Sequence, residues 1–324
     1  TFANDPERGL FILIFLFLLI FLSLFIFFFF YRENNKSDYS IFFLSKETSI
    51  LINNWFMMYF LSVILIGTTY PIFLEVVSSE KISVGPPFYN KLIAPFLVPF
   101  LFFMAIGPKL KWIKSDVSGK IYLILFFVIS LLLSILIVQN LKIEFLFNTI
   151  LITFSFYLFF ITVRDFVSKK YKNLSQNLAH FGFSLFILSI LLNNIFATEV
   201  ITNLKVGDSF KAEKFKINFE SLTQKDEKNY KSIIGKIIIE NSKGLIEVME
   251  PELRIYNQPN ISTSEADIKT GFLSDKFMTI NIVQNQEYFN VRYQVKPLMI
   301  WIWVSVLLIT FGGLLSLVRK KYEN

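Results

Sequence analysis

The stretch QNLAHFGFSL at residues 176–185 divides the chain into two parts of different character. Long runs of Phe, Leu and Ile precede it, and a polar block with strand-like patterns follows from residue 198 to residue 297. The stretch itself opens a further apolar run that ends at Ala197. Its His180 is the only histidine of the protein. The fold is therefore expected to change at this point, from membrane helices to a β-rich domain.

His180 has two interpretations on the residues alone. Imidazole is the commonest metal ligand and titrates near neutral pH. An ionisable side chain inside a membrane helix is costly, so it is by default a hypothesis for a functional site. Alternatively, a histidine near a helix end extends its polar tip to the lipid headgroups. The residues leave both interpretations open.

Composition places the chain among polytopic membrane proteins. Of its 324 residues, 54% are hydrophobic and 40 are Phe, and the apolar runs recur along the chain at lengths that cross a bilayer. Cysteine is absent, which excludes disulfides, thiolate metal sites and thiol nucleophiles. The net charge of +7 lies mostly in short loops, where membrane orientation explains it better than a nucleic-acid partner does.

Seven apolar runs predict seven transmembrane helices. They cover residues 10–31, 51–76, 92–106, 121–138, 145–163, 178–197 and 298–318. The predicted organisation is a membrane domain at 1–197 with six helices, an extracytoplasmic β domain at 198–297, and a last helix with a cytoplasmic tail at 298–324. The motif GPP at 85–87 predicts a rigid, extended connection before the third helix, which is either a stiff turn or a rigid segment over a site at the membrane face.

The basic residues of the short loops predict the orientation. One side carries Arg32, Lys36, Lys46, Lys109, Lys111, Lys114, Lys120, Arg164, Lys169, Lys170, Lys172, Arg319, Lys320 and Lys321. The other side carries only Arg8, Lys81, Lys91 and Lys142, if the large polar block is left out. Because Lys and Arg accumulate in cytoplasmic loops, the first side is predicted to be cytoplasmic, and the β domain and the N-terminal end periplasmic.

The polar block is predicted to form an antiparallel sandwich or partial barrel of about six strands. Period-two alternation or β-rich composition marks residues 215–219, 232–240, 245–248, 253–256, 277–283 and 288–295, with a hairpin turn at 241–244. The block contains no histidine. Its carboxylates are expected to be solvated rather than catalytic, namely Glu250, Glu252, Glu265, Asp267 and Asp275. The domain therefore favours protein contact over chemistry.

Several short motifs, taken together and in order, resemble the C-terminal half of the CcmF/NrfE family of cytochrome c haem lyase subunits. They are FAxDPxRG (2–9), GTxYP (67–71), ISVGPPFYN (82–90), GP (107–108), AHxG (179–182), PExRxY (251–256), SEAxI (264–268), and KP (296–297) with WIW (301–303) and GG (312–313). Each motif is weak alone, and the set is specific.

The resemblance implies that His180 is an axial ligand of a membrane-embedded b-type haem, whose second ligand lies outside this chain. Asn177 and Ser184 share the helix face of His180 and are candidates for orienting its imidazole. Gly182 would let the macrocycle or a neighbouring helix approach. Gly85, Pro86, Pro87, Asp5 and Arg8 are hypothesised to help frame the haem entry.

The family's tryptophan-rich haem-presenting segment, its two external histidines and the partner membrane histidine are absent from this sequence. The chain is therefore expected to be the C-terminal part of a longer protein and inactive alone.

The implied function is attachment of substrate haem to the Cys-x-x-Cys-His thiols of apocytochrome c at the periplasmic face of a bacterial inner membrane. The implied partners are the haem chaperone CcmE, CcmH/CcmI-type subunits that present apocytochrome c, and membrane lipid, without nucleic acid. The alternative is a multi-pass haem transporter, or a membrane receptor with an external β domain.

Overall fold

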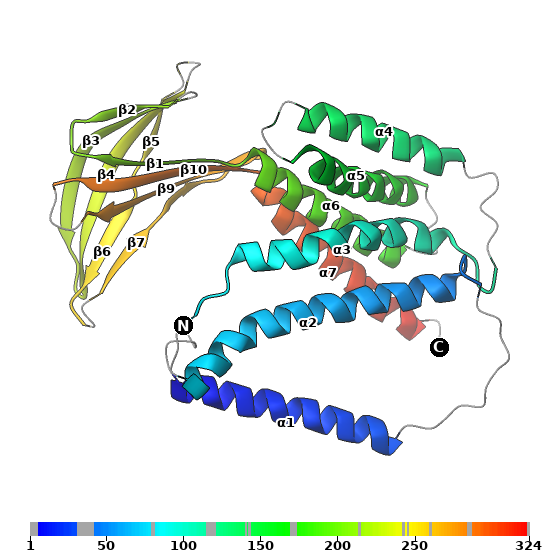
Figure 1. The fold of residues 1–324 in the computed structure, drawn as a ribbon. Helices are drawn as coiled ribbons and strands as arrows, with labels where there is room; N and C mark the ends of the chain where they lie inside the picture. Colours follow the sequence, from blue (N-terminus) through cyan, green and yellow to red (C-terminus); the bar gives the residue numbers. More distant parts are fainter. Residues whose placement is uncertain are drawn as a thin grey trace. The chain divides into compact units, whose positions relative to one another are not determined.

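A computed structural model describes residues 6–30, 42–78, 82–114, 121–139, 141, 144–168, 174–212, 215–241, 244, 246–258, 261–283 and 287–322. Figure 1 follows the chain from α1 to α7. The chain forms two compact units, Thr1–Arg164 and Asp165–Asn324, so the boundary falls in the last turn of α5. Each unit is considered by itself below.

Seven helices in the described ranges are long and apolar enough to cross a membrane. They are α1 (Pro6–Phe30), α2 (Lys46–Ser78), α3 (Pro86–Ile106), α4 (Ile121–Val138), α5 (Phe145–Val167), α6 (Leu174–Phe196) and α7 (Met299–Tyr322), with a short 3-10 turn, η2 (Gly107–Lys109), after α3. The predicted fold class is confirmed: seven apolar helices with a β domain before the last one. α2 begins five residues before its apolar run, because the Ser45 hydroxyl accepts a hydrogen bond from the Thr48 N–H (3.2 Å).

Aromatic packing joins the helices of the first unit. The Tyr59 ring of α2 lies 4.3 Å from the Phe96 ring of α3, and the Tyr59 hydroxyl donates to the Leu92 carbonyl at 3.0 Å. Phe127 of α4 meets Tyr157 of α5 edge to face, with ring centroids 5.7 Å apart. Because lipid tails are as apolar as these side chains, close packing rather than exclusion from water holds such helices together.

The GPP segment starts α3 instead of forming an extended connection. Gly85 is extended (φ −102°, ψ 179°) and occupies the N-cap position, while Pro86 and Pro87 form the first helical turn. Phe88 N–H donates to the Gly85 carbonyl at 3.1 Å. The prediction of an extended backbone is wrong for both prolines. Their fixed φ suits a helix, and the first turn needs no N–H donors from them.

The β domain is a sandwich of two antiparallel sheets (Figure 1). One sheet has the order β1 (Thr198–Leu204), β10 (Phe289–Pro297), β9 (Ser274–Ile282) and β8 (Asp267–Lys269). The other has the order β2 (Ser209–Lys211), β3 (Phe215–Asp226), β4 (Tyr230–Asn241), β6 (Glu252–Tyr256) and β7 (Ser262–Glu265), with β5 (Ile246–Met249) also paired to β4. The sequence analysis missed β1, β2, β7 and β8, which are short or polar.

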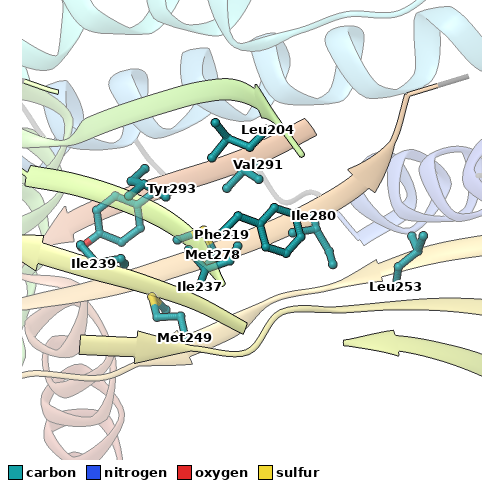
Figure 2. Packing of buried hydrophobic residues seen from close by; sticks show 11 residues of the cluster. Leu204, Phe219, Ile237, Ile239, Met249, Leu253, Met278, Ile280, Val291 and Tyr293 are labelled. Carbon is teal, nitrogen blue, oxygen red and sulfur yellow. The ribbon is translucent and has the colours of Figure 1, made fainter. Parts of the chain in front are cut away.

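The core of the sandwich takes side chains from both sheets (Figure 2). Phe219, Ile237 and Met249 of the larger sheet meet Met278 and Ile280 of the smaller one, and all five are almost fully buried. Figure 2 also shows Ile239 and Tyr293 together at one end of this cluster. Side chains alternate between the two faces of a strand. At that end of the cluster, the residues two positions further along each strand therefore also face inward.

Three of the carboxylates expected to be solvated have structural contacts instead. Asp275 is 6% exposed, and its Oδ1 accepts a hydrogen bond from Gly271 N–H at 3.1 Å. Asp267 accepts one from Glu250 N–H at 2.7 Å. Glu252 forms an ion pair with Arg254 at 2.8 Å. The expectation of a solvated side chain is wrong for Asp275, because the turn backbone needs an acceptor, which this short acidic side chain supplies.

The ion pairs of the β domain predict that it loses stability in acid. Hydrogen bonds from Arg254 and Arg292 hold the pKa of Glu252 and of Glu199, respectively, below the usual 4.5. A depressed pKa in the folded state adds stability above the unfolded-state pKa, and that stability is lost as the pH falls through the folded-state pKa. The melting temperature of the purified protein should therefore drop as the pH falls below 4.5. Glu252→Gln should reduce that drop, and an equal drop in the variant would contradict the assignment.

Candidate functional site

His180 lies in the second turn of α6 and is half-buried. The helix begins at Leu174 with the polar residues Ser175, Gln176 and Asn177, and then continues as an apolar run to Phe196. The imidazole therefore lies where the polar start of the helix gives way to its apolar body. Among the residues that the structure describes, no three His, Cys, Asp or Glu side chains gather as a metal site.

One face of α6 packs closely on α7 through two glycines. A Cβ on Gly182 would lie 2.9 Å from the backbone nitrogen of Ile309. A Cβ on Gly312 would lie 2.7 Å from the Ala179 nitrogen and 2.9 Å from the Ser175 carbonyl oxygen. Ser175, Ala179 and Gly182 therefore define the face of α6 that contacts α7. Gly182 was expected to let either a haem macrocycle or a neighbouring helix approach. The structure shows the helix, because α7 occupies the space next to this glycine.

His180, Asn177 and Ser184 share a different face of α6. Successive residues are about 100° apart around an α-helix, so these three lie about half a turn away from the face that contacts α7. Asn177 is half-buried and Ser184 is 1% exposed. The predicted clustering of the three on one face follows from the helix itself.

The hydrogen bonds of Asn177 and Ser184 show which of their donor groups are already used. The Asn177 amide donates to the Asp165 carbonyl at 3.1 Å. The Ser184 hydroxyl donates its single proton to the Phe181 carbonyl at 2.8 Å, and the Phe181 ring stacks on Phe166 at 5.5 Å. The amide of Asn177 and the hydroxyl of Ser184 each contain an oxygen of the acceptor type. A haem-bound imidazole needs an acceptor for its second N–H, so the chemistry of these two side chains is compatible with an axial ligand.

The other predicted site residues belong to earlier parts of the sequence. Gly85, Pro86 and Pro87 are at the start of α3 in the first unit, away in sequence from His180. Asp5 lies outside the described residues. Arg8 is in the first turn of α1, and its side chain lies outside the described part. The proposed haem-entry group therefore stays a prediction.

Sequence reasoning missed Glu75 of α2. Its side chain is 5% exposed, one turn after Pro71 in a helix that is otherwise apolar or neutral from residue 51 to residue 78. The signal was an acidic residue inside a predicted span, which is rare and marks functional positions in membrane helices. Glu75 is therefore a second candidate residue of the membrane helices.

The chain is similar to proteins of cytochrome c-type biogenesis. Residues 195–297 match the family described as the CcmF C-terminal beta-sandwich. The cytochrome c-type biogenesis protein CcmF of Pseudomonas fluorescens is 31% identical, over 100% of this chain and 51% of its own length. CcmF of Pseudomonas aeruginosa is 28% identical, over 100% and 51%. A solved structure of the cytochrome c haem lyase CcmF aligns with a TM-score of 0.66 at 20% identity, over 84% of this chain and 46% of the other.

The chain spans about half the length of the curated relatives it matches. The match runs across both units, from the apolar helices of the first to the sandwich and α7 of the second. The sandwich lies before the last helix in this chain, as in the fold of the solved haem lyase. The chain thus belongs to the CcmF/NrfE family of cytochrome c-type biogenesis proteins and corresponds to its C-terminal half.

Proposed function

We propose that the whole protein to which this chain belongs is a haem lyase subunit that attaches haem covalently to apocytochrome c. One observation carries the proposal: the alignment with CcmF proteins covers the whole chain, including His180, which lies on the opposite side of α6 from its glycine contact with α7. The reaction would join the two thiols of a Cys-x-x-Cys-His segment to the vinyl groups of substrate haem.

His180 is proposed as one axial ligand of a resident b-type haem, with the second ligand outside this chain. When bound, that haem would supply electron transfer, with its potential set by axial ligation and hydrogen bonding. The role of this chain would be to hold and orient the imidazole. The Ser184 oxygen and the Asn177 amide oxygen can accept its second N–H and so fix the ring and raise its basicity. Gly85, Pro86, Pro87, Asp5 and Arg8 remain proposals for haem entry.

The proposed setting is a bacterial inner membrane with the β domain in the periplasm and the C-terminus in the cytoplasm. The positive residues of the short loops support this orientation. CcmE is proposed to deliver haem to the periplasmic face, and CcmH/CcmI-type subunits to present the apocytochrome. The sandwich, which has no histidine, would serve these contacts rather than the chemistry.

Complementation tests the proposal. A strain that lacks the whole protein should regain c-type cytochromes with covalently bound haem when the gene is restored, as measured by haem staining of denaturing gels. A reporter cytochrome with both thiols replaced by serine should stay unstained, because no thioether can form. Restored haem in the periplasm without stained cytochrome would favour the alternative of a haem transporter and contradict the lyase.

A further inference from the structure

A short loop beside α7 presents two large apolar side chains. Phe272 and Leu273, between β8 and β9, are each 67% exposed. Gly271 makes the turn possible, because a Cβ there would lie 2.6 Å from the Ser274 carbonyl oxygen. The buried Asp275 carboxylate accepts the Gly271 N–H and holds the loop in place. The hydrogen-bonded loop therefore holds the side chains of Phe272 and Leu273 in exposed positions.

The loop is tied to the start of α7. The Trp301 indole N–H donates to the Phe272 carbonyl at 3.1 Å, and the two rings meet edge to face at 5.1 Å. Leu298 N–H donates to the Leu273 carbonyl at 2.8 Å. Because α7 is a candidate membrane span and tryptophan prefers the membrane–water interface, we expect this loop to lie at the level of the lipid headgroups.

A recess with charged side chains opens between the two sheets next to this loop. One cavity of about 420 Å³ is lined partly by Phe196, the last residue of α6, and by Phe215 and Tyr293. A second cavity of about 400 Å³ is lined by the loop itself and by Lys269. Both cavities share Glu247, Ser274 and Lys276. The two cavities therefore adjoin each other, and we refer to them together as the recess; Phe196 at the end of α6 lines one of them.

The charged residues of the recess face inward, which is unusual for a sandwich. Lys276 precedes the fully buried Met278 by two residues, and Glu247 precedes the fully buried Met249 by two, so strand alternation points both into the core layer. Lys276 and Glu247 form an ion pair. Lys269 is the direct cross-strand partner of Lys276. Like charges in that position repel each other.

The recess thus holds two ammonium groups and one carboxylate. Among the described residues Lys269 has no ion-pair partner, so one positive charge is left to attract an anion. A ligand with a phosphate for the two lysines and an ammonium for Glu247 would give each of the three side chains a partner of opposite charge. Charge-assisted hydrogen bonds of this kind are about twice as strong as neutral ones.

From this geometry we propose that the recess binds the phosphoethanolamine headgroup of a membrane phospholipid. The phosphate lies between Lys269 and Lys276, and the ammonium faces Glu247. The position of Phe272 and Leu273 at the bilayer surface makes a lipid, rather than a soluble phosphate compound, the source of this headgroup. The proposal needs α7 to cross the membrane and does not depend on the haem chemistry.

Native mass spectrometry of the whole protein tests the site. Detergent-solubilised protein is titrated with phosphatidylethanolamine, phosphatidylcholine and phosphatidylglycerol of identical acyl chains. Phosphatidylethanolamine should bind about tenfold more tightly than the other two, since each of them lacks one charge-assisted contact. The double variant Lys269→Ala, Lys276→Gln should weaken binding of phosphatidylethanolamine by about tenfold or more.

The matched control is Lys236→Gln, which removes the cation of the Glu220–Lys236 ion pair elsewhere in the same domain and should leave lipid binding unchanged. The exposed side chain of Lys269 allows Lys269→Ala to be tested alone as a variant that folds normally. Equal binding of the three lipids, or an equal loss in the control, would overturn the proposal. Displacement of the lipid by soluble glycerophosphoethanolamine at the same concentration would overturn its membrane source.

Discussion

Whole protein carrying His180→Ala is expected to lose the low-spin b-type haem spectrum that we expect of the wild type. Alanine supplies no axial ligand, and the iron would be left with its second ligand outside this chain. A six-coordinate iron then becomes five-coordinate and high-spin, or the haem dissociates. The reduced visible spectrum of the detergent-purified protein measures either outcome directly.

Three further variants separate ligation from helix structure. Gln176→Ala, on an exposed position of the same helix, should leave the spectrum unchanged. Ser184→Ala and Asn177→Ala should retain a low-spin haem with affinity reduced by about 10–100-fold, the typical cost of removing a group that orients a metal ligand. An unchanged low-spin spectrum in His180→Ala would reduce His180 to a structural residue.

Gly312→Ala is expected to destabilise the pairing of α6 with α7. The added methyl would lie within 3.0 Å of the Ala179 nitrogen and of the Ser175 carbonyl oxygen, and neither backbone atom can turn aside as a side chain could. Overpacking of this kind costs about 1–3 kcal/mol. The melting temperature of the purified protein in detergent should fall accordingly.

The neighbouring glycine provides the control. A Cβ on Gly313 would have no other atom within 4 Å, and alanine has the higher helix propensity. Gly313→Ala should therefore leave the melting temperature unchanged or raise it. Equal destabilisation by both substitutions would show that the close approach at Gly312 is not what holds the two helices.

The sequence predicted the helices well because hydropathy reports directly on membrane spans. The α4 prediction at 121–138 matches the observed helix end to end, since polar residues flank an uninterrupted apolar run. α2 and α6 begin earlier than predicted because their first turns are polar, and hydropathy does not detect capping. The GPP error came from treating proline as a helix breaker where it begins a helix.

The candidate site was less predictable. Helical spacing placed Asn177 and Ser184 beside His180, but only the resemblance to a family identified haem as a ligand. No pattern in the sequence could show that Gly182 faces α7, because that requires knowing which helix packs there. Glu75 was visible as a charge in an apolar run and was overlooked. Inward-facing charges in β5 and β9 were hidden by the assumption that polar strand positions face water.

The late position of α7 in the chain determines when α6 and α7 can pair during protein synthesis. The helix that carries His180 ends at Phe196, and its packing partner starts at Met299. The ribosome must synthesise the whole sandwich between the two, which takes roughly 5–20 s at usual translation rates. During that interval the glycine face of α6 lacks its neighbour. The helix that carries His180 can therefore pair with α7 only after the sandwich has been synthesised, which would delay the capture of haem until both helices are in place.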